Sequence, residues 1–141
     1  MTTIVNRRTR CIVAWDVLQT RSFDTMQPLV DQVFERVPHV GQFYSDGLPT
    51  YGELVYRQGR RSARHEVAPG KQQTYTVEGT NADLRCYVPP LDRRGRCFPR
   101  HLEKLRALLR LFITCYNRCC LFRLQHPNRM AHPSDFLPAL F

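Results

Sequence analysis

An unbroken apolar run near the start of the chain sets the first limit on its fold. Residues 11–18 read Cys-Ile-Val-Ala-Trp-Asp-Val-Leu, and Asp16 is the one charged member. A strand with one face in water alternates apolar and polar residues, whereas a strand covered on both faces is apolar throughout. We therefore expect a central strand over 11–18. A short strand over 4–5 precedes it, and a polar turn at 6–9 joins the two.

Helical and extended patterns then alternate along the chain. Met26, Val30, Val33 and Val37 recur at helical spacing, which predicts a helix that ends near Arg36. The remaining predicted elements are a strand over 40–44, a helix over 50–56, a strand near 65–67, and helices over 77–87 and about 99–122. This order is typical of an α/β fold with a small mixed sheet.

The length of 141 residues suits one domain. We place that domain at 1–122, and we expect residues 123–141 to form a loosely ordered C-terminal tail, because three prolines fall within 126–141. The longest apolar stretch, 108–116, is broken by Arg110 and Thr114, so no membrane-spanning helix is predicted. No secretory signal precedes the first charges, and we expect a cytoplasmic protein.

Positive charge is concentrated in the second half of the sequence. The chain carries 21 Lys and Arg against 12 Asp and Glu, a formal net charge of +9. Residues 1–56 hold five basic residues and six acids, whereas residues 57–129 hold 16 basic residues and five acids. Nearly all the bases are arginine, whose planar group binds phosphate through two hydrogen bonds. The pattern favours a nucleic-acid partner, and arginine enrichment by codon usage is the alternative.

The cysteines do not form a recognisable metal motif. Cys115, Cys119, Cys120, His126 and His132 are close in sequence, but no Cys-x-x-Cys pair accompanies them. We expect buried, inert thiols at these positions.

Two acids stand where α/β proteins place functional carboxylates. Asp46 ends the predicted strand over 40–44, and Glu78 opens the predicted helix over 77–87. Each also has a structural interpretation: Asp46 precedes Gly47 as in a tight turn, and Glu78 complements a helix dipole. His65 lies between the two acids in sequence; we expect it on a surface loop, with a position facing the site as the alternative.

The order of several short motifs resembles a known enzyme family. Ser45-Asp46-Gly47 is followed by Pro49 and Tyr51, and then by Tyr75-Thr-Val-Glu-Gly-x-Asn-x-x-Leu-Arg85. A basic stretch that ends Arg96-Cys-Phe98 comes next, before a leucine-rich helix. Over about residues 1–118 this arrangement is similar to the DDE transposases of the smallest bacterial insertion sequences.

The resemblance implies a ribonuclease H-like fold and metal-dependent cleavage and strand transfer of DNA. Asp46 matches the second catalytic aspartate and Glu78 the catalytic glutamate, while Asn81 and Arg85 match positions on the same helix. The implied cofactor is Mg²⁺, two ions held by carboxylates. The implied partners are transposon ends and target DNA in the bacterial nucleoid, with a homo-oligomer allowed. DNA contacts are expected from Arg85, Arg93, Arg94 and Arg96.

One departure concerns the first catalytic aspartate. The family takes it from the first strand of the sheet, whereas Asp16 falls on what corresponds to the third strand, so Asp16 is a weak candidate. We therefore expect a transposase domain that lacks its N-terminal part and first strand, with impaired activity. The alternative is a non-catalytic, DNA-binding remnant of a transposase.

Overall fold

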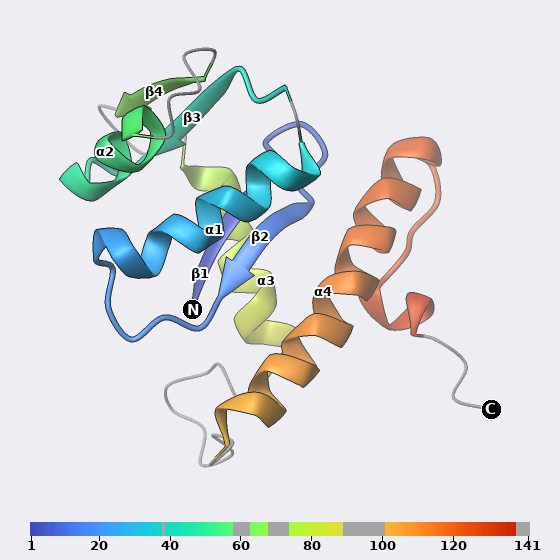
Figure 1. The fold of residues 1–141 in the computed structure, drawn as a ribbon. Helices are drawn as coiled ribbons and strands as arrows, with labels where there is room; N and C mark the ends of the chain where they lie inside the picture. Colours follow the sequence, from blue (N-terminus) through green and yellow to red (C-terminus); the bar gives the residue numbers. More distant parts are fainter. Residues whose placement is uncertain (38, 58–62, 68–73, 89–100, 138–141) are drawn as a thin grey trace. The chain divides into compact units, whose positions relative to one another are not determined.

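The computed structural model describes residues 1–37, 39–57, 63–67, 74–88 and 101–137 (Figure 1). Its elements, in chain order, are β1 (Thr2–Val5), β2 (Ile12–Asp16), α1 (Phe23–Arg36), β3 (Gln42–Ser45), α2 (Pro49–Arg57), β4 (Arg64–Val67), α3 (Tyr75–Tyr87), α4 (Leu102–Gln125) and a 3₁₀ helix η2 (Pro133–Phe136). The described residues form a mixed α/β protein with two small sheets and four α-helices. The chain divides into two compact units, which we call unit 1 (residues 1–4 and 13–78) and unit 2 (residues 5–12 and 79–141).

The predicted helices and strands are present, with small shifts at their ends. The helix predicted to end near Arg36 is α1, which ends there. Helix α3 begins at Tyr75, two residues before the predicted start, and α4 continues to Gln125 rather than 122. Such shifts are ordinary, because helix ends depend on local capping more than on apolar periodicity.

The prediction of a central strand over 11–18 was wrong for the described part of the chain. There, β2 pairs with β1 in a two-stranded sheet, and β3 pairs with β4 in another. Burial along β2 alternates at its start: Ile12 and Ala14 are buried, whereas Val13 and Trp15 are half-buried. A strand with a partly covered face can carry the same apolar residues as a strand covered on both faces. The sequence pattern alone therefore could not distinguish a central strand from a strand of a two-stranded sheet.

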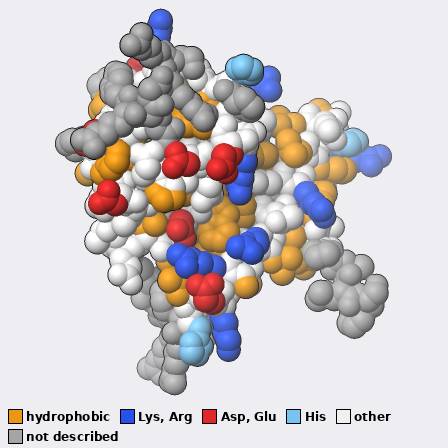
Figure 2. Space-filling view, in the orientation of Figure 1, with side chains coloured by type: hydrophobic (Ala, Val, Ile, Leu, Met, Phe, Trp, Pro, Cys, Tyr) orange, Lys and Arg blue, Asp and Glu red, His pale blue; other side chains and the backbone are white. Residues whose placement is uncertain are grey.

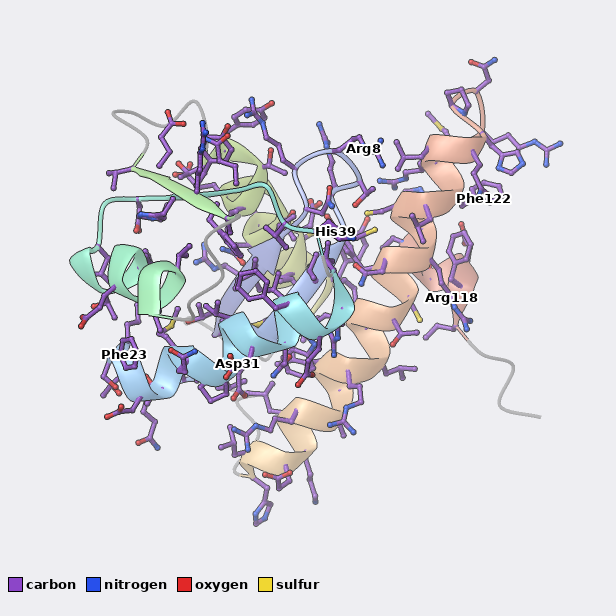
Figure 3. All side chains as sticks on the ribbon, turned by 45° about the horizontal axis from the view of Figure 1, so that its top comes forward. Arg8, Phe23, Asp31, His39, Arg118 and Phe122 are labelled. Atoms are coloured by element: carbon purple, nitrogen blue, oxygen red, sulfur yellow. The ribbon has the colours of Figure 1, made fainter. Side chains whose placement is uncertain are left out.

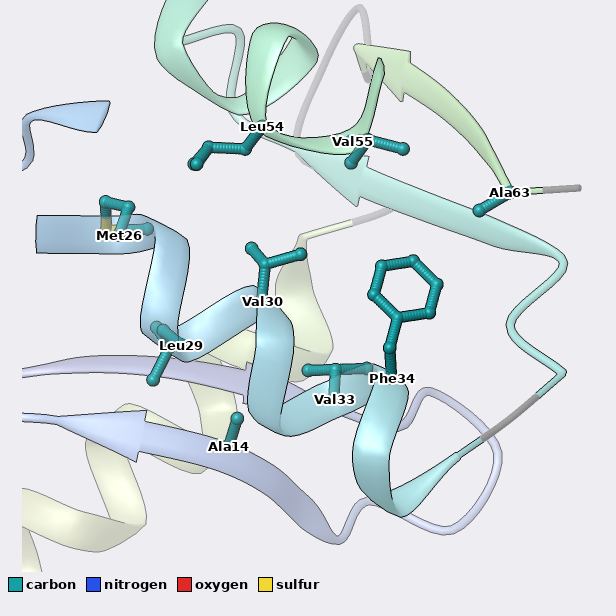
Figure 4. Close-up of a cluster of buried hydrophobic side chains, with 9 residues drawn as sticks. All are labelled: Ala14, Met26, Leu29, Val30, Val33, Phe34, Leu54, Val55 and Ala63. Atoms are coloured by element: carbon teal, nitrogen blue, oxygen red, sulfur yellow. The ribbon is translucent and has the colours of Figure 1, made fainter. Parts of the chain in front are cut away.

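The core of unit 1 forms around α1. Met26, Leu29, Val30, Val33 and Phe34 recur at three- and four-residue spacing, which places them on one face of the helix. Figure 4 shows this face between Ala14 of the hairpin and Leu54 and Val55 of α2. Ala63, just before β4, completes the buried cluster. Helix α1 therefore connects the hairpin and the β3–α2–β4 segment within one apolar core.

Strands β3 and β4 run parallel, and α2 makes the connection between them. Phe43 lies opposite His65, and Ser45 lies opposite Val67. Two parallel strands need a crossover segment, since a tight turn can join only antiparallel neighbours. This geometry brings residues about 20 positions apart in sequence onto adjacent strands.

Unit 2 is built on the long helix α4. Leu105, Leu109, Ile113 and Tyr116 are buried along it, and the 3₁₀ helix η2 packs against it. Three further buried side chains of α4 are Cys115, Cys119 and Cys120. The expectation of buried thiols at these positions is confirmed. Each of these thiols donates to a backbone carbonyl, which satisfies its hydrogen-bonding group.

None of the described helices combines the length and the apolar character that crossing a membrane requires.

Candidate functional site

Asp46 lies directly after the last residue of β3, and its side chain is exposed. The next residue, Gly47, has φ +83, a conformation that glycine adopts without strain. A Cβ at Gly47 would also come within 3.2 Å of Val67 Cγ1. The Asp-Gly turn that the sequence indicates is therefore real, and it holds the carboxylate at the C-terminal end of a parallel strand.

A hydrogen bond joins side chains of β3 and β4 one residue before Asp46. Ser45 Oγ and His65 Nε2 are 2.8 Å apart. The other edge of the imidazole faces α2, because a Cβ on Gly52 would lie 3.4 Å from His65 Nδ1. The prediction that His65 lies on a surface loop was wrong: it is half-buried on β4, and burial lowers its pKa. The ring is therefore held mainly in its neutral form at pH 7.

Two further side chains, Arg21 and Tyr51, lie near Asp46 at the same end of β3. Burial raises the pKa of the Tyr51 hydroxyl, and the nearby charge of Asp46 raises it further. Arg21 acts in the opposite direction, through its positive charge and a hydrogen bond to Tyr51. Arg21 comes from the segment between β2 and α1, Asp46 follows β3, and Tyr51 belongs to α2. A carboxylate, a phenol and a guanidinium are thus neighbours here.

Glu78 occupies the first turn of α3, with its side chain exposed. Its backbone N–H donates to Thr74 O at 3.0 Å, so the helix is already formed at this residue. Asp16 ends β2, is half-buried, and accepts a hydrogen bond from the backbone N–H of Val17 at 2.7 Å. Glu78, Asp46 and Asp16 all belong to unit 1.

These acids do not form a three-ligand metal site in the described structure. Across residues 1–37, 39–57, 63–67, 74–88 and 101–137, no three His, Cys, Asp or Glu side chains are grouped as a metal ion needs. Two carboxylates in one unit remain as candidate ligands.

The predicted DNA-contacting residues fall into two groups. Arg85 is exposed on α3, and Asn81 is half-buried on the same helix. Both belong to unit 2, whereas Glu78 of that helix belongs to unit 1. Arg93, Arg94 and Arg96 lie outside the described residues.

Sequence reasoning missed the role of Arg21 and of the Ser45–His65 pair. Tyr51 was visible only as part of a motif. A histidine between two candidate acids was a weak signal, and its partner could be identified only from the parallel pairing of β3 with β4. Arg21 carried no signal, because the segment from 17 to 22 matches no motif.

The two units differ sharply in charge. Unit 1 holds seven basic residues and eight acids, a net charge of −1, and unit 2 holds 14 basic residues and four acids, a net charge of +10. On the face drawn in Figure 2, the part over the C-terminal half of α4 shows blue and pale-blue side chains and no red one. These net charges equal those of residues 1–56 and 57–141 of the sequence, although the two units are made of different residues.

No protein-family model, curated protein or solved structure matches this chain.

Proposed function

We propose that this chain acts in DNA transposition as the catalytic part of a DDE transposase, with Asp46 and Glu78 as catalytic carboxylates. One observation carries the proposal: the two acids that the motif order selects are both exposed, and both belong to unit 1. Asp46 stands at the C-terminal end of a parallel strand, which is where open α/β sheets gather functional groups.

The order of elements supports a ribonuclease H-like arrangement for this unit. A hairpin, β1–β2, is followed by α1 and then by β3, which ends at the candidate aspartate. Under the proposal, β1 and β2 correspond to the second and third strands of that fold, and α1 to its first helix. Asp16 then lies on the third strand, so we assign it no catalytic role.

The donor chemistry suits Mg²⁺. This ion prefers oxygen ligands and is commonly held by one or two carboxylates together with substrate phosphates and water. Asp46 and Glu78 supply two carboxylates, which is enough to hold one ion against a phosphate. A second ion needs a further ligand, and the described residues offer no group of three. We therefore expect weak metal binding and slow chemistry from this chain alone.

The proposed reaction is phosphoryl transfer at a DNA phosphodiester. A water oxygen attacks phosphorus and the bond to the 3′-oxygen breaks; in the joining step a 3′-hydroxyl takes the place of water. Bound Mg²⁺ would polarise the phosphate and stabilise the developing negative charge. The Ser45–His65 hydrogen bond holds the end of β3, and so fixes the backbone from which Asp46 projects.

Metal binding and nicking test the proposal together. Mn²⁺ binding to the full chain can be followed by electron paramagnetic resonance, and Mg²⁺-dependent nicking by the relaxation of supercoiled plasmid. We expect Asp46→Asn and Glu78→Gln each to weaken Mn²⁺ binding at least ~10-fold, because each removes a charged oxygen ligand. Nicking should fall below detection in both variants.

Asp24→Asn is the matched control, since Asp24 is an exposed acid in the first turn of α1, in the same unit. It should leave both measurements unchanged. Mn²⁺ binding that survives both test substitutions, or that is lost equally in the control, would rule out the assigned site.

A second function is favoured by the charge of unit 2. A net charge of +10 suits a protein that binds DNA without cutting it. DNA binding with no metal binding and no nicking would support this non-catalytic role.

A further inference from the structure

The tip of the β1–β2 hairpin, residues 6–11, carries three arginines within four positions. Arg7, Arg8 and Arg10 are all exposed. In a count along the sequence they fall in the near-neutral first part of the chain. In the structure they belong to unit 2, the unit of net charge +10. Folding therefore adds these three charges to the basic unit.

The tip has a fixed backbone conformation. Asn6 Oδ1 accepts hydrogen bonds from the backbone N–H groups of Arg8 and Thr9, each at 3.0 Å. Asn6 O accepts another from Arg10 N at 2.7 Å. Arg10 has φ +61, a value uncommon for a residue with a side chain. These bonds position the arginine backbones before any ligand binds, which reduces the conformational entropy that binding must remove.

Helix α4 anchors the tip from the side. The Asn117 side chain accepts from Ile12 N at 2.8 Å and donates to Ile12 O at 2.9 Å. The Cys120 thiol contacts Arg10 O at 3.9 Å. Figure 3 shows Arg8 on the hairpin loop, beside the half of α4 that carries Arg118. Arg118 follows the anchoring Asn117 directly and is exposed.

The described acids of unit 2 contact other groups. Glu103 pairs with Arg106 at 3.1 Å. Asp135 accepts from the backbone N–H of His132 at 2.7 Å. Asp83 Oδ2 lies 3.4 Å from the hydroxyl of Tyr116. All three lie on helices and none on the hairpin tip.

We propose that the hairpin tip is a binding site for the phosphate backbone of duplex DNA, with Arg7, Arg8 and Arg10 as the phosphate ligands. Guanidinium groups bind phosphate through paired hydrogen bonds, and such contacts position a protein on DNA without reading its sequence. The choice of duplex DNA rests on the proposed function; the choice of a phosphate polyanion rests on the charge of the tip.

The experiment measures the affinity of the full chain for a fluorescent 25-base-pair duplex at several salt concentrations, in EDTA. The test variant carries Arg8→Gln and Arg10→Asn, since asparagine tolerates a positive φ. Each phosphate contact contributes about 0.9 to the slope of log affinity against log salt. We expect the slope to fall by about 1.8, and the affinity at 0.1 M salt to fall by about 50-fold.

The matched control carries Lys104→Gln and Arg129→Gln, two exposed cations of unit 2 on other segments. The control removes the same number of positive charges as the test variant. Its slope of log affinity against log salt should fall by less than about one third of the fall expected for the test variant. Circular dichroism checks that both variants fold. Should the test variant fail to fold, Arg8→Gln should lower the slope by about 0.9 and Arg8→Lys should restore most of it.

Equal losses in the test and control variants would overturn the proposal, because net charge would then explain the binding. Duplex RNA that competes more strongly than duplex DNA would overturn the choice of DNA. EDTA removes divalent metal, so the outcome is independent of whether Asp46 and Glu78 form a catalytic site. If the variant without the tip arginines nicks DNA and its slope of log affinity against log salt is unchanged, only this inference is rejected.

Discussion

Unit 1 and unit 2 are similar in size but differ in how their charges and cores are built. Unit 1 has a net charge of −1, and an aliphatic core in which α1 packs on the hairpin and on α2. Unit 2 has a net charge of +10, and a core along one long helix that includes three thiols and a tyrosine. The candidate metal ligands lie in the first unit and the arginine-rich tip in the second. The candidate carboxylates and the arginine-rich tip thus belong to different compact units.

The largest effect that tests this comparison comes from the two cores. Leu29 in unit 1 and Leu109 in unit 2 are both almost fully buried. Leu29→Ala and Leu109→Ala should each lower the free energy of unfolding by about 2–5 kcal/mol, through lost apolar contact and a cavity. Hydrogen exchange should show the loss of protection mainly in the unit that carries the substitution.

Leu121→Ala is the control for this pair, because Leu121 is 47% exposed; it should cost less than about 1 kcal/mol. Equal loss of protection in both units from either core substitution would show that they unfold as one, and the division into units would fail.

A smaller effect is expected at the anchor of the hairpin tip. Asn117→Ala removes both side-chain hydrogen bonds to Ile12 and leaves a backbone N–H and a C=O without those partners. We expect the free energy of unfolding of unit 2 to fall by about 1–3 kcal/mol. The Ile12 amide should exchange faster with solvent.

Arg118→Ala, at the next and exposed position, is the matched control for stability and should change it by less than about 0.5 kcal/mol. An Ile12 amide that stays protected in Asn117→Ala would show that the anchor lies elsewhere.

The smallest expected effect is a pH dependence confined to unit 1. Burial lowers the pKa of His65 in the folded protein below its usual 6.5, so the unfolded chain binds more protons between those two values. Stability from this residue is therefore complete above about pH 6.5, and falls as the pH drops toward the folded pKa. Chemical denaturation between pH 5 and 8 should show this trend, and His65→Gln should reduce it.

Ser45→Ala separates burial from hydrogen bonding at this site, because it removes the 2.8 Å contact and keeps the imidazole. A pH trend that persists unchanged in His65→Gln would assign the titration to another group.

Local structure was largely predictable from the sequence, and pairing between distant segments was not. The apolar spacing of Met26, Val30 and Val33 located α1, and Asp46-Gly47 located a turn, since both signals act over a few residues. The partner of β2 could not be predicted, because an apolar strand does not specify how many neighbours it has. The contact between Ser45 and His65 requires the parallel register of β3 and β4, which depends on the whole core of unit 1.

The site was predictable only as a set of residue types. Motif order selected Asp46 and Glu78, and the structure places them in one unit without grouping three ligands. The hairpin arginines were hidden by counting charge along the chain, because contacts with α4 join residues 5–12 to a unit whose other members begin at residue 79.

The buried thiols of α4 have a practical consequence. Cys115 donates to Phe136 O and Cys119 to Ala131 O, so these two thiols attach the segment after α4 to the helix. Burial raises the pKa of Cys119, and that of Cys120 to about 11, which leaves both protonated at neutral pH. Alkylating reagents can modify Cys115 and Cys119 at a useful rate only when the segment after α4 separates from the helix. The rate of that labelling therefore reports how often this end of the molecule opens locally.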